Sequence, residues 1–94
     1  MKNVNTLIVG FSKGMTRGDE KNGIAPRPFY VAHLGIPFGV EGLTSFATGT
    51  GYMSKSVYLD SADEYEEATT YKVGEVYPLT ILNLGQGRYK WVID

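Results

Sequence analysis

The segment VNTLIVGFS at residues 4–12 is the clearest indication of the fold. Successive side chains of an extended chain point to opposite faces, so Leu7, Val9 and Phe11 share one face of this segment. A period of two predicts a β-strand rather than a helix. The same alternation returns at residues 29–35 and predicts a second strand.

Outward from these two segments, the chain continues as short strands and one helix. Residues 52–59 alternate again and predict a third strand. A capping box, S-x-x-E, begins one short helix at Ser61, which we expect to end near Thr69. The last two strands are expected at residues 76–84 and 88–93, joined by a glycine-rich hairpin turn.

This order of elements predicts a mostly-β fold. Residues 1–94 are too few for two separate cores, so we expect one binding domain. Twelve glycines and four prolines supply the tight turns that such a domain needs. Five short strands with one short helix before the fourth favour a five-stranded Greek-key barrel of the OB type. A two-sheet sandwich is the main structural alternative.

The sequence offers little for catalysis. It contains no cysteine, which removes thiolate nucleophiles and thiolate metal ligands. His33 is the only histidine, and its place in the apolar alternation favours a partly buried, hydrogen-bonded side chain. The acidic residues near the helix lack the spacing of a calcium loop. We therefore expect a non-enzymatic protein with no cofactor and no metal site.

Nothing in the sequence predicts a membrane or secreted protein. No apolar run approaches the ~20 residues that span a bilayer, and the apolar stretch in residues 1–9 is too short for a secretory signal. The absence of cysteine fits a reducing compartment. We expect a cytoplasmic protein.

Charge is distributed unevenly along the chain. The net charge is −1, but residues 1–28 hold five basic against two acidic residues, a net +3. Residues 41–75 hold seven acids against two lysines, a net −5. Such asymmetry places opposite potentials on different parts of a small protein.

The positive charge gathers in a polar, glycine-hinged connection at residues 14–28, which leads into two adjacent aromatic residues. Proteins that bind single-stranded nucleic acid combine cations for the phosphates with aromatic rings on which bases stack. We predict that Tyr30, Tyr52 and Tyr58 stack bases. The complete predicted nucleic-acid-binding set is Lys13, Arg17, Lys21, Arg27, Tyr30, Tyr52, Lys55 and Tyr58.

A structural interpretation of the same residues stands beside this one. Small β-domains build their cores from aromatic residues, and we expect Phe11, Phe29, Tyr71 and Trp91 to be core for that reason. Lysines in a polar loop are ordinary surface.

Three features of the chain resemble one known family. A long basic wing follows the first strand, the second strand ends in Leu34-Gly35, and a Tyr71-Lys72-Val73-Gly74 turn precedes the closing strands. This layout resembles the helix-destabilising, single-stranded-DNA-binding proteins of filamentous phages, the gene V family. The segment at residues 43–70 is longer than the family pattern leads us to expect.

The resemblance implies an OB-like barrel, a homodimer, and cooperative coating of single-stranded DNA during phage or plasmid replication in the host cytoplasm. By matching position, it implies that Arg17, Lys21 and Tyr30 lie on or near the DNA path.

An acidic segment around the helix supports a different function. Its carboxylates would lie away from a bound strand, or they would dock onto a basic protein partner. The alternative is therefore a small phage protein that inhibits or modulates a host complex. A structural subunit of a virion is a third possibility. The acidic residues concerned are Asp60, Asp63, Glu64, Glu66 and Glu67.

Overall fold

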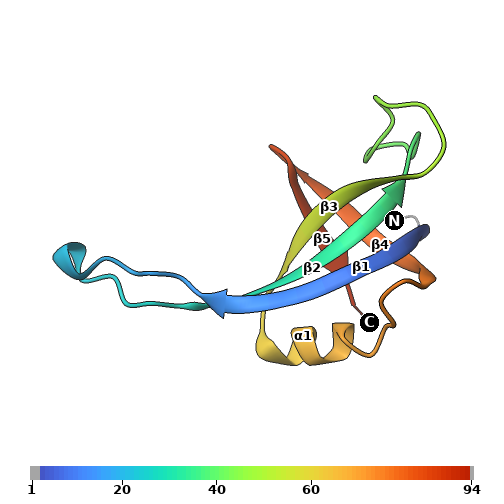
Figure 1. The fold of residues 1–94 in the computed structure, drawn as a ribbon. Helices are drawn as coiled ribbons and strands as arrows, with labels where there is room; N and C mark the ends of the chain where they lie inside the picture. Colours follow the sequence, from blue (N-terminus) through green and yellow to red (C-terminus); the bar gives the residue numbers. More distant parts are fainter. Residues whose placement is uncertain (1–2, 94) are drawn as a thin grey trace.

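The computed structural model describes residues 3–93 and confirms a mostly-β chain with one short α-helix (Figure 1). The strands are antiparallel, and the sheet order is β3-β2-β1-β4-β5. A single turn of 3-10 helix, η1 (Glu20–Asn22), lies between the first two strands. The elements are β1 (Asn3–Met15), β2 (Pro28–Pro37), β3 (Tyr52–Leu59), α1 (Ala62–Ala68), β4 (Val76–Gly85) and β5 (Arg88–Val92).

Strand β1 organises the sheet because it pairs on both sides. Its residues 3–7 pair with β4, and its residues 7–15 pair with β2. The outer strands β3 and β5 come back into contact with each other, although no strand pairing joins them within residues 3–93. The five strands therefore form a strongly curved sheet rather than a flat one (Figure 1).

A bulge in β1 changes which side chains face the core. The register shifts between Ile8 and Gly10, and the extra residue reverses the alternation beyond it. Ile8 is fully buried before the bulge, whereas Phe11 packs against the core after it. The simple alternation placed Phe11 on one face with Val9, and this was wrong because Val9 is exposed.

The core lies inside the curved sheet and uses aromatic residues from several elements. Trp91 is buried, and Tyr71 packs against it with ring centroids 5.1 Å apart. These two core predictions are confirmed. Phe29 is different, because its half-buried ring covers Gly14 on the neighbouring strand. A Cβ atom at Gly14 would lie 2.8 Å from that ring, so the glycine makes room for it.

Helix α1 begins and ends where the sequence predicts. The Ser61 hydroxyl accepts a hydrogen bond from the Glu64 backbone N–H at 3.2 Å, which satisfies one free donor of the first turn. The helix lies beneath the sheet at the base of the long hairpin (Figure 1) and buries Ala68. Across residues 3–93, no helix has the length and apolar character needed to cross a membrane.

The connection between β2 and β3 contains turns and no strand. Thr44 is fully buried within it, donates a hydrogen bond to the Pro37 carbonyl at 2.6 Å and accepts one from the Val40 N–H at 2.9 Å. These bonds tie the connection to the end of β2.

Candidate nucleic-acid interface

The basic connection is an ordered two-stranded hairpin, which we call the arm (residues 13–30). Pairing of β1 with β2 continues to Met15 and Pro28. Beyond it, the Thr16 N–H donates to the Arg27 carbonyl at 2.8 Å. The polar, glycine-hinged connection is therefore a hydrogen-bonded hairpin rather than an unpaired loop. Figure 1 shows the arm projecting well beyond the sheet.

The arm presents its cations to solvent. Arg17, Lys21 and Arg27 are all exposed. The nearby Asp19 carboxylate is used within the tip, where it accepts from the backbone N–H of Lys21 at 3.1 Å and from the Asn22 side chain at 2.6 Å. The tip is thus held by local hydrogen bonds while the basic side chains extend from it.

At the base of the arm, the predicted stacking residue Tyr30 is not free. Its half-buried ring packs on Tyr65 of α1, with centroids 5.5 Å apart. The ammonium group of Lys13 lies 5.7 Å from the same Tyr65 ring. Tyr30 and Lys13 therefore join the arm to the helix, and Tyr30 has only part of its surface left for a ligand.

Strand β3 places the other two predicted tyrosines on its outer face. Tyr52 is exposed, and Tyr58 is more so, at 69%. Lys55 lies on the opposite face, where its Nζ is 4.7 Å from the Tyr89 ring centroid and 5.7 Å from that of Phe46. Phe46 is itself 75% exposed, an aromatic residue that the sequence interpretation did not select.

His33 has the structural role that the sequence favours. It is partly buried in β2, and its Nε2 and Nδ1 lie 2.8 Å from the Ser12 hydroxyl and 3.1 Å from the Ser56 hydroxyl. The imidazole ring therefore links β1, β2 and β3 across the outer face of the sheet.

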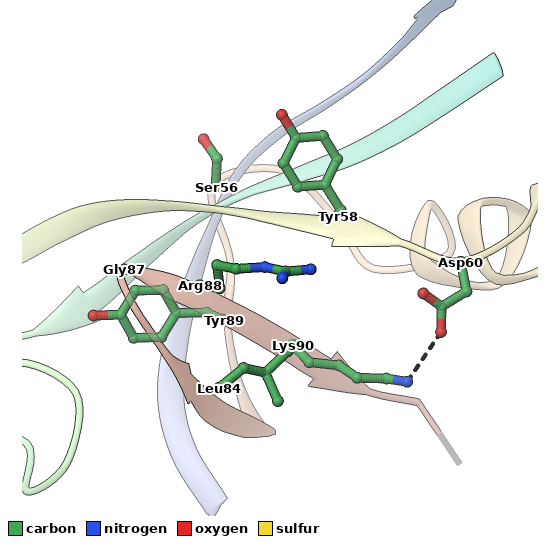
Figure 2. A pocket seen from close by; sticks show the side chains of 8 residues that line it. All are labelled: Ser56, Tyr58, Asp60, Leu84, Gly87, Arg88, Tyr89 and Lys90. Atoms are coloured by element: carbon green, nitrogen blue, oxygen red, sulfur yellow. Dashed lines mark hydrogen bonds and ion pairs between the residues drawn. The ribbon is translucent and has the colours of Figure 1, made fainter. Parts of the chain in front are cut away.

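A groove opens where β3 faces the β4–β5 hairpin, and we call it the seam groove (Figure 2). Its volume is about 160 Å³, which is smaller than the ~300–1,000 Å³ of pockets for whole small molecules. This volume is enough for one flat ring but not for a complete cofactor. The residues that line it are Ser56, Tyr58, Asp60, Leu84, Gly87, Arg88, Tyr89 and Lys90.

An ion pair stands at one end of this groove. Lys90 Nζ donates to Asp60 Oδ2 at 2.9 Å (Figure 2). The hydrogen bond to Asp60 and its negative charge raise the pKa of Lys90 above its usual value. Both side chains remain open to solvent, at 41% exposure for Lys90 and 67% for Asp60. Arg88, also exposed, extends beside Lys90 in the same direction.

The structure thus distributes the predicted residues over the arm, the seam groove and the rest of β3, where Tyr52 and Lys55 lie. Tyr58 lies in the seam groove, while the arm carries the predicted cations except Lys55. The predicted set omitted Arg88 and Lys90, although the sequence RYKW at residues 88–91 alternates cations with aromatic rings. That alternation was the available signal, because it places both cations on one face of β5.

The acidic segment is divided as well. Asp60 lies in the groove beside Tyr58 rather than away from it, while Asp63, Glu66 and Glu67 are exposed on α1. Among the residues that the structure describes, no three acidic or histidine side chains are grouped so that they could hold a metal ion.

Comparison of the chain with protein-family models, with curated proteins and with solved structures found no match.

Proposed function

We propose that this chain binds single-stranded DNA without catalysing a reaction, holding bases in the seam groove and phosphates along the arm. One observation carries the proposal: the exposed side chain of Tyr58 lines the same groove as Arg88 and Lys90, and the volume of that groove is about that of one base. Stacking of an unpaired base on such a ring contributes about 1–3 kcal/mol. Duplex bases are already stacked on each other, so the groove favours a single strand.

We further propose that the fold is of the OB type. The order β3-β2-β1-β4-β5, with α1 between β3 and β4, and the contact between β3 and β5 support this assignment. In OB folds, the face of strands 2 and 3 and the loops after strands 1 and 4 bind oligonucleotides. Here those regions correspond to the outer face of β3, the arm and the β4–β5 turn. This support is an analogy at the level of the fold.

The arm contributes contacts of a different kind in this proposal. Arg17, Lys21 and Arg27 are exposed along a projecting hairpin, which lets them follow a phosphate backbone. Phosphate contacts fix position without reading sequence. The resemblance to the filamentous-phage proteins adds a homodimer and a role in phage or plasmid replication to the proposal.

The first experiment is fluorescence anisotropy with a labelled oligonucleotide of mixed sequence, offered as single strand and as duplex at several salt concentrations. We expect tighter binding of the single strand, with log K falling by about 0.7 per phosphate contact for each tenfold rise in salt. Binding that is absent at low salt, or unaffected by salt, contradicts the proposal. An RNA strand of the same sequence tests the preference for DNA.

The exposed acidic face of α1 favours a second candidate, a protein-interaction module. Asp63, Glu66 and Glu67 lie together on this short helix, outside the seam groove. A basic partner would be attracted to such a face. Capture of a partner from nuclease-treated host lysate, lost when these three residues become lysine and retained in Tyr58→Ala, would favour this function over DNA binding.

A further inference from the structure

We infer that the ring of Phe46 is a second base-stacking position, which holds a further nucleotide of the strand whose base enters the seam groove. The inference rests on the proposed function and extends the binding path of the same site. Its starting point is an aromatic ring that is 75% exposed although it belongs to a turn fixed by hydrogen bonds.

The turn that carries Phe46 is anchored on two sides. The Ala47 N–H donates to the carbonyl of Thr44 at 3.1 Å, and Thr44 is fully buried. On the other side, the Asn83 side chain of β4 donates to the Gly42 carbonyl at 2.7 Å. An exposed ring on an anchored turn is held in position before a ligand arrives, so a stacking contact costs less conformational entropy.

Phe46 is connected to the seam groove through Lys55 and Tyr89. Tyr89 lines the groove, and Figure 2 shows its ring at the end of the groove away from Asp60. The Lys55 Nζ lies 4.7 Å from the Tyr89 ring centroid and 5.7 Å from the Phe46 ring centroid. This ammonium group therefore bridges the two rings and places Phe46 close to the Tyr89 end of the groove.

The other end of the groove points toward the arm. Asp60 directly precedes α1, and α1 lies at the base of the arm (Figure 1). The connection between β2 and β3, which carries Phe46, lies at the end of the sheet opposite the arm (Figure 1). A strand that runs from the arm through the seam groove thus leaves the groove toward Phe46.

The surroundings of Phe46 suit a base better than a protein partner. Within residues 38–51, all of which the structure describes, Phe46 is the one large apolar side chain that is exposed, and its exposed neighbours Ser45 and Thr48 are polar. A protein-docking surface needs a contiguous apolar patch, whereas a base needs one flat face. A ring beside a cation is the combination that single-strand binders use for a base and its phosphate, and Lys55 supplies the cation.

The test uses four substitutions at Phe46 and a mixed-sequence single strand. Phe46→Ala and Phe46→Leu both remove the flat ring, so we expect each to bind at least about 5-fold more weakly, the lower limit for one stacked base. Phe46→Tyr keeps the ring and should bind as the wild type does. Phe46→Trp reports on the position directly, because the one natural tryptophan, Trp91, is buried. Its emission should be quenched by the strand more than that of the wild type.

The matched control is Val73→Ala, which removes an exposed apolar side chain from the turn before β4 and should keep wild-type affinity. An equal loss of affinity in this control overturns the inference. Wild-type affinity in Phe46→Ala or Phe46→Leu also overturns it, as does emission of Phe46→Trp that responds no more than that of the wild type.

The remaining outcomes separate this inference from the proposed function. Unchanged DNA binding in Phe46→Ala, together with loss of a protein captured from host lysate, assigns the ring to a protein partner and overturns the inference. The proposed function stands in that case if Tyr58→Ala still weakens binding of the strand. Absence of single-strand binding by the wild type overturns the proposed function itself.

Discussion

The arm and the seam groove contain different combinations of charge and aromatic surface. The arm exposes four cations, while its aromatic residues Phe29 and Tyr30 are half-buried. The groove exposes Tyr58, and there one of two cations is paired with a carboxylate. Projecting cations without exposed rings suit contacts to a phosphate backbone, whereas an exposed ring in a groove suits stacking on a base.

The two regions also arise differently along the chain. The arm is a local hairpin whose partners are close in sequence. The groove needs the curvature of the sheet, because Asp60 and Lys90 are 30 residues apart and lie on opposite sides of the seam. Substitutions in the arm should therefore weaken contacts to phosphates, whereas substitutions in the groove should weaken stacking on bases.

The largest expected effect is the loss of the ring in the groove. Tyr58→Ala should weaken single-strand binding by about 1–3 kcal/mol, which is roughly 5- to 150-fold, because a stacking platform is removed. Tyr58→Phe keeps the ring and should bind nearly as the wild type does. Since Tyr58 is largely exposed, the free energy of unfolding should stay within ~0.5 kcal/mol for both variants. Wild-type affinity in Tyr58→Ala would remove the groove from the DNA path.

The next effect concerns the arm. Arg17→Ala combined with Lys21→Ala should weaken binding to all strands alike, because these cations contact no base in the proposal. The slope of log K against log salt should decrease by about 1.4, at ~0.7 for each lost phosphate contact.

Both side chains are exposed, so the melting temperature should not change. Lys72→Ala, at an exposed lysine outside the arm, is the control. A parallel loss of affinity and melting temperature would mean that the arm cations have a structural role.

Tyr30 provides the contrast with Tyr58. Its ring contacts Tyr65, and aromatic pairs contribute about 0.5–1.5 kcal/mol beyond their buried area. Tyr30→Ala should therefore lower the free energy of unfolding in urea by about 1–2 kcal/mol and reduce affinity less than Tyr58→Ala does. The reverse order, with stability kept and binding lost, would place Tyr30 among the residues that stack bases.

The smallest expected effect is at Lys13, where the arm meets the helix. Its ammonium group lies over Tyr65, and an exposed cation–π contact contributes about 0.5–1 kcal/mol. Lys13→Ala should lower the free energy of unfolding by about 0.5 kcal/mol in addition to a loss of affinity. Urea titration beside Arg17→Ala, which should show no such loss, separates the two contributions.

Much of the fold could be predicted because its signals are local. The boundaries of β3 follow from a run of strict alternation at residues 52–59, and those of α1 from the Ser61 capping box. The hairpin structure of the arm could not be predicted, because residues 16–27 have no alternation of buried and exposed side chains that would indicate strand pairing. The bulge between Ile8 and Gly10 could not be predicted from the sequence either, since a shift in register depends on the partner strand.

The sequence by itself determined the β-rich class, the order of the elements and the concentration of cations at residues 13–27. Each follows from the residue types and their periodicity. The tertiary structure alone decided that Tyr30 packs on a helix while Tyr58 remains exposed, although both stand in similar alternating segments. It also decided that Asp60 meets Lys90 across the seam. The physical reason is that burial and pairing depend on which distant element covers a residue, and sheet curvature sets that.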